Sequence, residues 1–500
     1  MAIIGLDTEI VEVEADTTGG THFIIVGLPD AAVQESKERV RSAIKNSGFY
    51  FPRGRTVVNL APADLKKQGP SFDLPIAVSV LKKTKQIPDT FRDSPKEIFA
   101  GELALDGKIR PVNGILPMAI AAKKQNVESF YVPAENASEA GLVPGTNIFP
   151  VHTLKELIEH LNGERIIEPI KTPRISLKNM ADLEKYDFAF IRGQEHAKRA
   201  LEIAAAGGHN ILMSGPPGSG KTLLSRALPG ILPDLTVDEA LEVTKIYSVA
   251  GELPTDLPII SSRPFRSPHH TASGVSLVGG GAWPRPGEVS LAHRGVLFLD
   301  ELPEFDRQVL ENLRQPLEDG LVTISRVAGT IQFPAKFMLV AARNPCPCGY
   351  TNDPYGNCTC SPIQVSNYNK KISGPLLDRI DLHVDVPKIK FEKLESNEMA
   401  ESSTAIQARV QAARHRQEKR FQDTGIFTNA EMSSEQTRHF CPQNDEIKKL
   451  LRQAVEQMNL SARAYFRILK IGRTIADLEA SDEIQTKHIA EALQYRPRVE

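Results

Sequence analysis

No apolar run in the sequence approaches the roughly 20 residues that are needed to cross a bilayer. The first residues turn acidic and lack the basic segment with which a secretory signal begins. Neither sign of charge is in excess, since 60 Lys and Arg face 62 Asp and Glu. We therefore expect a cytoplasmic protein without membrane contact, in which any affinity for nucleic acid comes from local patches.

Cysteine is scarce, and its distribution is uneven. There are five cysteines in 500 residues, and four of them lie within 346–360. This spacing is unlike a secreted disulfide framework and is typical of a metal site. Cys346 and Cys348, with Cys358 and Cys360, can supply four thiolates to one tetrahedral zinc. Such a closed site would be structural, although the tight C-x-C spacing leaves free thiols as the alternative.

The length indicates about three domains, and 41% apolar with 24% charged residues excludes a disordered chain. Residues 1–165 read as a mixed α/β domain, and the polar, aperiodic residues 166–186 as a linker. Residues 187–388 have the apolar strands and Gly/Pro punctuation of a parallel-sheet α/β domain, whereas residues 389–500 are predicted to be helical. In the first domain we expect strands over 3–16, 56–62 and 97–107, and helices over 31–48 and 115–125.

The sharpest motif is a complete G-x-x-x-x-G-K-[ST] sequence, which follows the apolar strand 211–213 and precedes a helical pattern. Its residues are Gly215, Pro216, Pro217, Gly218, Ser219, Gly220, Lys221 and Thr222. Backbone N–H groups of such a loop surround phosphate oxygens at a helix amino terminus. Lys221 would reach the β- and γ-phosphates of ATP, and Thr222 would ligate Mg²⁺.

Two further apolar strands end in polar side chains. The run 295–299 ends at Asp300 and Glu301, and the run 337–342 is soon followed by Asn344. Asp300 would hold Mg²⁺ through water, Glu301 would act as the general base, and Asn344 could orient the attacking water. Because open parallel sheets bind ligands at the carboxyl ends of their strands, these residues predict an ATPase site.

Longer motifs carry a family resemblance over essentially the whole chain. The chain resembles the magnesium-chelatase-like AAA+ ATPases of the ComM (YifB) group, which implies an AAA+ core with a helical carboxyl-terminal lid. The motifs are 191–195, 263–271, 286–293, 344–349, 377–379, 461–463 and 473–478.

The resemblance implies a role for several of these residues. Asn344 would be sensor 1, Arg379 the arginine finger offered to a neighbouring subunit, and Arg463 sensor 2. Gly193 and Gln194 belong to the box that lies near the adenine. One departure is Arg343, which stands where an apolar residue is expected before the sensor Asn. For Arg473, structural pairing is at least as good an interpretation as catalysis.

Two inserts flank the Glu301 strand, and the resemblance implies that both point into the channel of a hexameric ring. One carries Arg285 and Trp283, and the other is a hairpin of strands 322–327 and 330–335 that carries Arg326. The two arginines would track a DNA backbone and Trp283 could stack on bases, although Gly- and Pro-rich loops are also ordinary surface turns.

A basic helix is predicted over 405–421, and it carries Arg409, Arg414, Arg416, Lys419 and Arg420. These residues could form a DNA-facing stripe. A solvated face or a subunit interface is the commoner explanation, because basic helices often pair with acidic neighbours. The pair His269 and His270 reads more readily as a polar contact within a loop than as a set of metal ligands.

The first domain resembles Lon-type proteases around Gly69–Pro75 and Gly101–Ile115, with Ser71 in the segment that carries the nucleophile. Those enzymes use a Ser–Lys dyad. The position of the base falls on Leu116, which cannot accept a proton. The domain is therefore expected to be an inactive scaffold of the ribosomal-S5-like kind.

Together these features favour an ATP- and Mg²⁺-dependent hexameric motor acting on branched or single-stranded DNA. The resemblance implies a branch-migration helicase that supports recombination in natural transformation, with recombination proteins as partners. The alternatives are a motor subunit of a metal chelatase, which would not predict the Lon-like domain or the cysteine loop, and an ATP-regulated scaffold.

Overall fold

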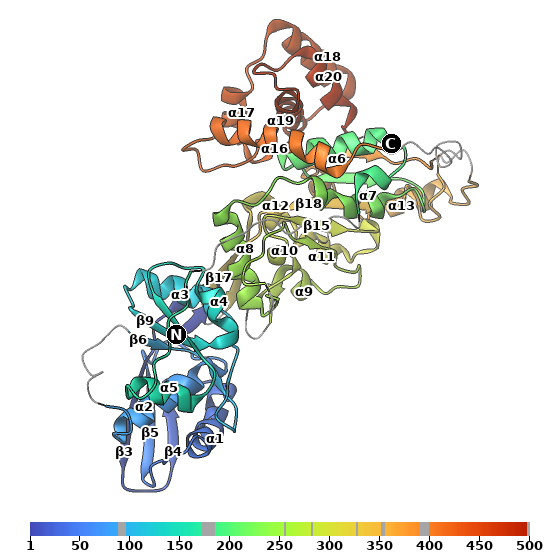
Figure 1. Cartoon of the computed structure of the whole chain (residues 1–500). Helices are drawn as coiled ribbons and strands as arrows, with labels where there is room; N and C mark the ends of the chain where they lie inside the picture. The colour runs from blue at the N-terminus through green and yellow to red at the C-terminus, as the bar shows by residue number, and fades with distance from the viewer. Residues whose placement is uncertain are drawn as a thin grey trace.

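A computed structural model describes residues 1–88, 97–172, 186–254, 257–281, 284–326, 329–351, 356–389 and 400–497, without the side chain of Arg326. The molecule is elongated, with the amino-terminal region at one end, a sheet-containing core in the middle and a helical region at the other end (Figure 1). Among the helices described, none is long and apolar enough to span a membrane.

The amino-terminal region is a mixed α/β unit built on two small sheets, with strand orders β3-β5-β4 and β10-β9-β6. Helices α1 and α2 pack together, and their apolar faces share one core with β5. The elements are β1 (Ala2–Ile4), β2 (Asp7–Glu9), β3 (Glu12–Thr18), β4 (Phe23–Val26), α1 (Ala31–Asn46), β5 (Arg55–Ala61), α2 (Asp73–Lys83), β6 (Glu97–Phe99), β7 (Glu102–Leu103), β8 (Ile109–Arg110), α3 (Ile115–Lys124), β9 (Ser129–Pro133), α4 (Ala137–Ala140), β10 (Asn147–Val151) and α5 (Leu154–Leu161).

Two predicted strands of this region were wrong, and the stretch 97–107 contains the two short strands β6 and β7 instead of one. Residues 3–16 do not form a single strand, because Gly5 adopts a left-handed φ of 64° and turns the chain back on itself. Ile4 then pairs with Asp7 in an antiparallel β1–β2 hairpin, and β3 begins only at Glu12. A left-handed backbone of this kind suits glycine, which has no Cβ to clash.

The core contains a five-stranded sheet with the order β12-β15-β18-β11-β19 in which every pairing is parallel. Its strands are β11 (Ile211–Ser214), β12 (Phe265–Arg266), β15 (Val296–Leu299), β18 (Met338–Arg343) and β19 (Leu382–Asp385). Strands β11 and β15 are almost completely buried, which explains their continuous apolar sequences. The predicted α/β fold with a P-loop core is confirmed.

The remaining helices of the core surround this sheet (Figure 1). They are α6 (Glu195–Gly207), α7 (Lys221–Ala227), α8 (Val237–Ala250), α9 (Gly274–Val278), α10 (Glu288–Leu291), α11 (Arg307–Glu311), α12 (Arg314–Asp319), α13 (Pro362–Asn369) and α14 (Gly374–Leu377).

Two hairpins project from the core as inserts, and they pack against each other. Strand β13 (Gly279–Gly280) pairs with β14 (Arg285–Pro286), and β16 (Leu321–Arg326) pairs with β17 (Gly329–Pro334), as the sequence predicted for the second hairpin. A Cβ added to Gly279 would lie 3.4 Å from Cδ1 of Ile324, so the two hairpins are in van der Waals contact. Trp283 lies outside the described residues.

The carboxyl-terminal region is helical, as expected, and its helices start at well-formed caps. Ser402, Ser433, Asn444 and Ser461 each accept a hydrogen bond from a backbone N–H in the first turn of the helix that follows. The helices are α16 (Ser403–Arg420), α17 (Ser434–Phe440), α18 (Asp445–Met458), α19 (Ala462–Leu478) and α20 (Thr486–Gln494). Helices α16 and α19 pack on α6, so this region shares one apolar core with the sheet domain.

Helix α8 joins the core to the amino-terminal region. The Ser248 hydroxyl donates to Oε1 of the buried Glu139 at 2.5 Å, and the Gly114 N–H donates to the Ser248 carbonyl at 3.0 Å. Leu235 and Ala240 enter an apolar cluster made mainly by the amino-terminal region. The two regions therefore meet through a packed interface, and most of the predicted linker, residues 173–185, lies outside the described residues.

Candidate nucleotide site and its surroundings

The phosphate-binding loop predicted at 215–222 lies between β11 and α7, at the carboxyl edge of the sheet. Gly218 and Gly220 have φ angles of 73° and 92°, which only glycine adopts without strain. These two turns bring the chain into α7, whose first residue is Lys221. The loop thus has the strand–turn–helix setting that the motif requires.

Lys221 is folded onto the loop that carries it. Its ammonium donates to the carbonyl oxygens of Gly215 at 2.6 Å and Pro216 at 2.9 Å, and to Asn344 Oδ1 at 3.3 Å. Burial lowers the pKa of Lys221, while the nearby carboxylates of Asp300 and Glu301 act in the opposite direction. A phosphate in the loop would give this ammonium an anionic partner in place of neutral carbonyls, and hydrogen bonds between ionised partners are among the strong ones.

A magnesium site can form from Thr222 and Asp300. The Thr222 hydroxyl donates to Asp300 Oδ2 at 2.8 Å, although these residues are 78 positions apart in the chain. Hydroxyl and carboxylate oxygens are the ligands that Mg²⁺ takes together with water and phosphate. The sheet thus brings together the two residues that the sequence predicted as Mg²⁺ ligands.

Glu301 follows Asp300 and stands at the entrance of the site. It has a left-handed φ of 51°, and its side chain is 55% exposed. This backbone conformation is strained for a residue with a Cβ, and such strain is concentrated at functional sites. The carboxylate is accessible to water, as a general base must be.

Asn344 and Gln194 both contact the loop through hydrogen bonds. Asn344 follows β18 and accepts from Lys221, and the neighbouring Arg343 donates instead to Asn369 Oδ1 at 3.4 Å. The unexpected arginine therefore leaves the Asn344–Lys221 contact intact. Gln194 donates to the Ser219 carbonyl at 3.2 Å and the Pro387 carbonyl at 2.5 Å, which places the predicted adenine box beside the loop.

Sequence reasoning missed the contact between His270 and Glu301. His270 Nδ1 lies 3.8 Å from Glu301 Oε2, and its ring is tilted by 34° to that of His269, with centroids 4.1 Å apart. The imidazole follows β12 and therefore ties the first insert to the proposed base. No spacing rule in the sequence relates these two residues, because the pairing of β12 with β15 brings them together.

Arg379 and Arg463 lie far from the phosphate-binding loop of their own chain. Both line a cavity of about 960 Å³ with Asn210, Gly295 and Met338, which stand at the amino ends of the strands. Arg379 and Arg463 both approach Glu318, and the Arg379 guanidinium lowers the pKa of that carboxyl through a hydrogen bond. The length of β19, about 13 Å at 3.3 Å per residue, separates this edge from the loop.

The four clustered cysteines fit one metal ion. Their sulfur atoms all lie within 4.8 Å of one another, and Cys346 Sγ is 3.4 Å from Cys348 Sγ and 3.8 Å from Cys358 Sγ. A tetrahedral zinc with Zn–S bonds of about 2.3 Å requires sulfur separations of roughly 3.8 Å. Thiolates are soft ligands that select zinc over Mg²⁺. The donor set therefore suits a structural zinc, and Cys441 is buried elsewhere in the chain.

The basic residues of α16 are mostly paired within the chain. Arg409 binds Glu202 and Glu401, Arg416 approaches Asp482, and Arg420 binds Asp477. Arg414 donates to the carbonyls of Ala205 and Phe427, and burial lowers its pKa to about 10. Arg409, Arg416 and Arg420 thus bind acidic side chains of their own chain, which disfavours the DNA-facing stripe.

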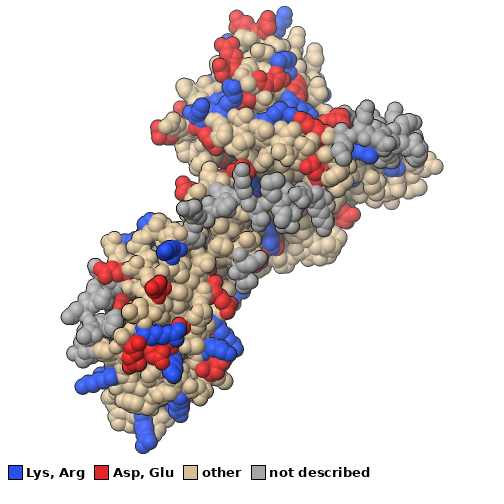
Figure 2. Space-filling view, viewed as in Figure 1, with Lys and Arg blue, Asp and Glu red and all other residues tan. Residues whose placement is uncertain are grey.

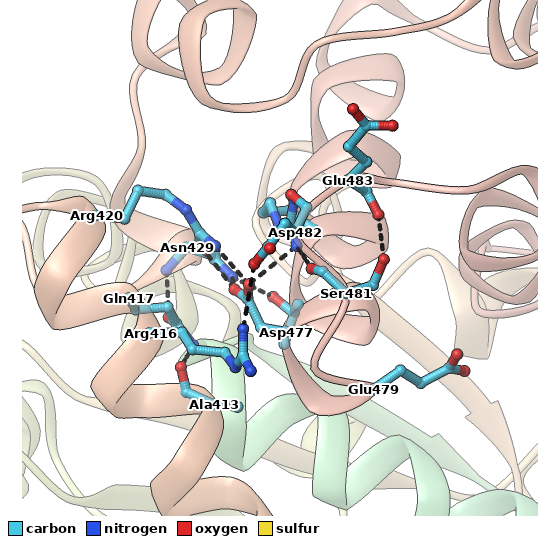
Figure 3. Close-up of polar contacts among 12 residues, drawn as sticks. Ala413, Arg416, Gln417, Arg420, Asn429, Asp477, Glu479, Ser481, Asp482 and Glu483 are labelled. Atoms are coloured by element: carbon cyan, nitrogen blue, oxygen red, sulfur yellow. Dashed lines mark hydrogen bonds and ion pairs between the residues drawn. The ribbon is translucent and has the colours of Figure 1, made fainter.

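Arg473 is a packing residue of the helical region. Its guanidinium is 2% exposed, pairs with Asp477 Oδ1 at 3.1 Å and donates to the Asp482 carbonyl at 2.7 Å. Figure 3 shows Arg420 and Asn429 converging on the same Asp477 carboxylate from neighbouring segments. Breaking a buried ion pair of this kind typically lowers the free energy of unfolding by about 3–5 kcal/mol. This stabilising role explains the R-T-I-A-D sequence without a role in catalysis.

The amino-terminal region has no base at the position that the Lon likeness assigns to it. Leu116 is fully buried in an apolar cluster, and its N–H donates to Glu139. Lys108 pairs with Asp106 on the surface, and Lys123 is exposed on α3. Neither lysine replaces the missing base beside Ser71.

Charges of both signs are interspersed over the face of the molecule drawn in Figure 2. This agrees with the nearly neutral composition. Exposed Arg285, on β14, remains a local source of positive charge on the inserts.

Comparisons with known proteins cover almost all of the chain. Family profiles described as "Subunit ChlI of Mg-chelatase", "Magnesium chelatase, subunit ChlI" and "Magnesium chelatase, subunit ChlI C-terminal" match residues 11–136, 187–394 and 400–496. The competence protein ComM of Haemophilus influenzae is 44% identical over 100% of this chain and 96% of its own length. The YifB protein of Escherichia coli is 42% identical over 99% and 96%. The magnesium-chelatase 38 kDa subunit of Rhodobacter capsulatus is 30% identical over 32% of this chain and 50% of its own.

Proposed function

Since the chain belongs to the magnesium-chelatase-like AAA+ family and within it to the ComM and YifB group, we propose that it is an ATP-driven ring motor that moves branched DNA. The observation that carries this proposal is the division of the ATPase machinery between two edges of one sheet. Thr222 and Asp300 lie at the carboxyl edge, and Arg379 and Arg463 at the amino edge.

This division makes a single chain incomplete as an ATPase. The γ-phosphate develops charge during transfer, and a permanently ionised arginine stabilises that charge. In a ring, the amino edge of one copy would face the nucleotide of the next, and Arg379 and Arg463 would serve as arginine finger and sensor 2 there. Glu318, which now binds Arg379, would release it to the phosphate. A homo-hexamer is the assembly that we propose.

Within one chain, the residues at the carboxyl edge have distinct proposed roles. Lys221 binds the β- and γ-phosphates, Thr222 and Asp300 hold Mg²⁺, and Glu301 removes a proton from the attacking water. Asn344 orients that water. Gly193 and Gln194 form one wall of the adenine site, supported by the contact of Gln194 with the loop.

DNA is proposed as the substrate because the two inserts adjoin each other and carry arginines. Both inserts flank β15, the strand that Asp300 and Glu301 follow. The name of the Haemophilus influenzae relative indicates a role in competence, and we extend it here to branch migration during recombination. His270 lies at the base of the first insert and contacts Glu301, so movement of that insert on DNA would reach the catalytic carboxylate directly.

We expect that replacing both Arg285 and Arg326 by Ala will weaken DNA binding and abolish stimulation of ATP turnover by DNA, while basal turnover persists. Each lost phosphate contact reduces the slope of log K against log salt by about 0.9, and a ring multiplies the effect by the number of subunits. The measurement is binding to forked DNA over a range of salt concentrations.

The control is the Lys449→Ala/Arg452→Ala protein, which removes two exposed cations from α18. Its net charge therefore changes by the same amount as that of the insert variant. It should keep wild-type affinity and salt slope. If the variant without Arg285 and Arg326 also keeps wild-type affinity and salt slope, these arginines do not bind DNA in the channel of the ring. The basic helix α16 is then the next surface to examine.

A chelatase motor subunit is the second function that an observation favours, since the Rhodobacter capsulatus subunit matches part of the chain. Such a subunit shares the ATPase core and would drive Mg²⁺ into a porphyrin. The much longer match to ComM favours the DNA motor. An ATP-regulated scaffold would bind nucleotide without turnover.

The amino-terminal domain is proposed as an inactive Lon-like scaffold that supports ring assembly.

We expect one zinc per chain, held by Cys346, Cys348, Cys358 and Cys360, because their sulfur atoms already have nearly tetrahedral separations. Elemental analysis of protein purified without added metal measures the ratio. Cys441→Ser should retain the zinc, since Cys441 is remote from the cluster, whereas Cys348→Ser should lose most of it. A ratio well below one in the wild-type protein would indicate free thiols.

A further inference from the structure

The cysteine loop lies directly against the phosphate-binding loop. Gly349, between the two cysteine pairs, has a left-handed φ of 85°. A Cβ added to it would lie 2.4 Å from Cδ and 2.8 Å from Cγ of Pro217, distances that real Cβ atoms essentially never show. The Gly349 backbone therefore touches the Pro217 ring. On the side of Gly349 Cα that faces this ring, there is space for a hydrogen atom but not for a side chain.

The conformation of Gly349 depends on the cysteine cluster around it. Its N–H donates to the Cys346 carbonyl at 2.9 Å. Two residues later, the Thr351 N–H donates to Cys346 Sγ at 3.3 Å, and the Thr351 hydroxyl lies 3.1 Å from Cys358 Sγ. The turn that presents Gly349 to Pro217 is thus held by the Cys346 backbone at one end and, at the other, by Thr351, which contacts two of the sulfur atoms.

The same loop reaches the phosphate site at a second point. Asn344 precedes Cys346 by two residues and accepts from the Lys221 ammonium. The first cysteine pair is therefore bracketed by two contacts with the phosphate-binding loop, Asn344 with Lys221 and Gly349 with Pro217. A displacement of the cysteines would move both contacts together.

In its described residues, 346–351 and 356–360, the loop has little apolar core with which to hold itself. Cys346 is buried, but Cys358 is exposed and Cys348 and Cys360 are half-buried. In such loops the free energy of metal binding is the free energy of folding, because the unfolded segment has no preformed site. Without a metal, four thiols within 4.8 Å have only weak hydrogen bonds to keep them together.

We propose that a thiophilic divalent cation on the four cysteines braces the phosphate-binding loop, so that the affinity for nucleotide depends on metal occupancy. The inference rests on the zinc site proposed above and extends it from local structure to regulation of the ATP site. Coupling between two sites is reciprocal, so bound nucleotide must also raise the affinity for the metal by the same factor.

The first test measures ADP affinity by calorimetry on the full-length protein in three states: zinc-loaded, stripped with a chelator, and reloaded with zinc. Coupling free energies between sites usually correspond to 5- to 150-fold, and we expect ADP to bind about tenfold more weakly after stripping and to recover on reloading. In parallel, equilibrium competition with a colorimetric chelator should show about tenfold tighter zinc binding when ADP is present. Equal affinity in the loaded and stripped states would overturn the proposal.

The second test uses Gly349→Ala, which keeps all four cysteines but places a methyl group against Pro217. It should retain one zinc per chain and still bind ADP about tenfold more weakly. Gly425→Ala is the matched control, because Gly425 has a similar φ of 74° and open space where the Cβ would be. The control should bind ADP as the wild type does.

Wild-type ADP affinity in Gly349→Ala would overturn the coupling, whatever its zinc content. If the purified wild-type protein contains no zinc, both the metal site and this inference are overturned. Failure of the DNA-motor proposal would leave these results unaffected, since neither test involves DNA.

Discussion

Glu301→Gln should bind ATP with near wild-type affinity and hydrolyse it about 10²–10⁴-fold more slowly, the usual contribution of a general base. The amide preserves the size and left-handed backbone of the residue but cannot accept a proton from water. Glu301 contacts neither Lys221 nor Thr222 in the bonds that define the phosphate site, so nucleotide binding should survive. Phosphate release and equilibrium ATP titration measure the two quantities separately.

The matched control is Glu304→Gln, a carboxylate three residues later that pairs with Lys371 at 3.2 Å on the surface. It should turn over ATP as the wild type does. If Glu301→Gln stays within about threefold of the wild type, the base is a different residue and the role proposed for Glu301 fails.

Lys221→Ala should abolish ATP binding or turnover, the largest loss of affinity that we expect from any single substitution. Its ammonium is buried in the loop, where it has only neutral oxygen partners at 2.6–3.3 Å. The free protein thus holds a partly desolvated cation whose natural partner is a phosphate. Removing it deletes that charge without breaking an ion pair of the fold.

The thermal midpoint of Lys221→Ala should therefore remain close to that of the wild type, which separates a binding defect from unfolding. Lys245→Ala, on α8 and remote from the loop, should leave ATP binding unchanged. Normal hydrolysis by purified Lys221→Ala would contradict the nucleotide site as a whole.

Much of the nucleotide site could be predicted because its signals are local. The sequence places Gly218, Gly220 and Lys221 after an apolar strand, and backbone geometry at glycine gives the loop its turns. Asp300 and Asn344 could be assigned because parallel strands bring their carboxyl ends to one edge. The hairpin of β16 and β17 was predicted from alternation around a small turn, and the structure confirms it.

What could not be predicted depends on contacts between distant segments. Residues 3–16 alternate like one strand, and only the turn at Gly5 divides them. The contact of His270 with Glu301 depends on strand order, and that of Gly349 with Pro217 depends on how a loop folds back over its neighbour. The sequence of α16 left a DNA-facing stripe open as the less common explanation, because the acidic partners Glu202 and Asp477 come from other elements.

The central claim is that ATP hydrolysis by this protein serves movement on DNA. The most direct measurement is the ATP turnover of the full-length protein with and without a four-way DNA junction, with Glu301→Gln as the blank. The account predicts a turnover that rises severalfold on the junction and less on an unbranched duplex of the same length. A turnover that is unchanged by every DNA, together with no DNA binding at low salt, would contradict it and favour the chelatase-type motor or the scaffold.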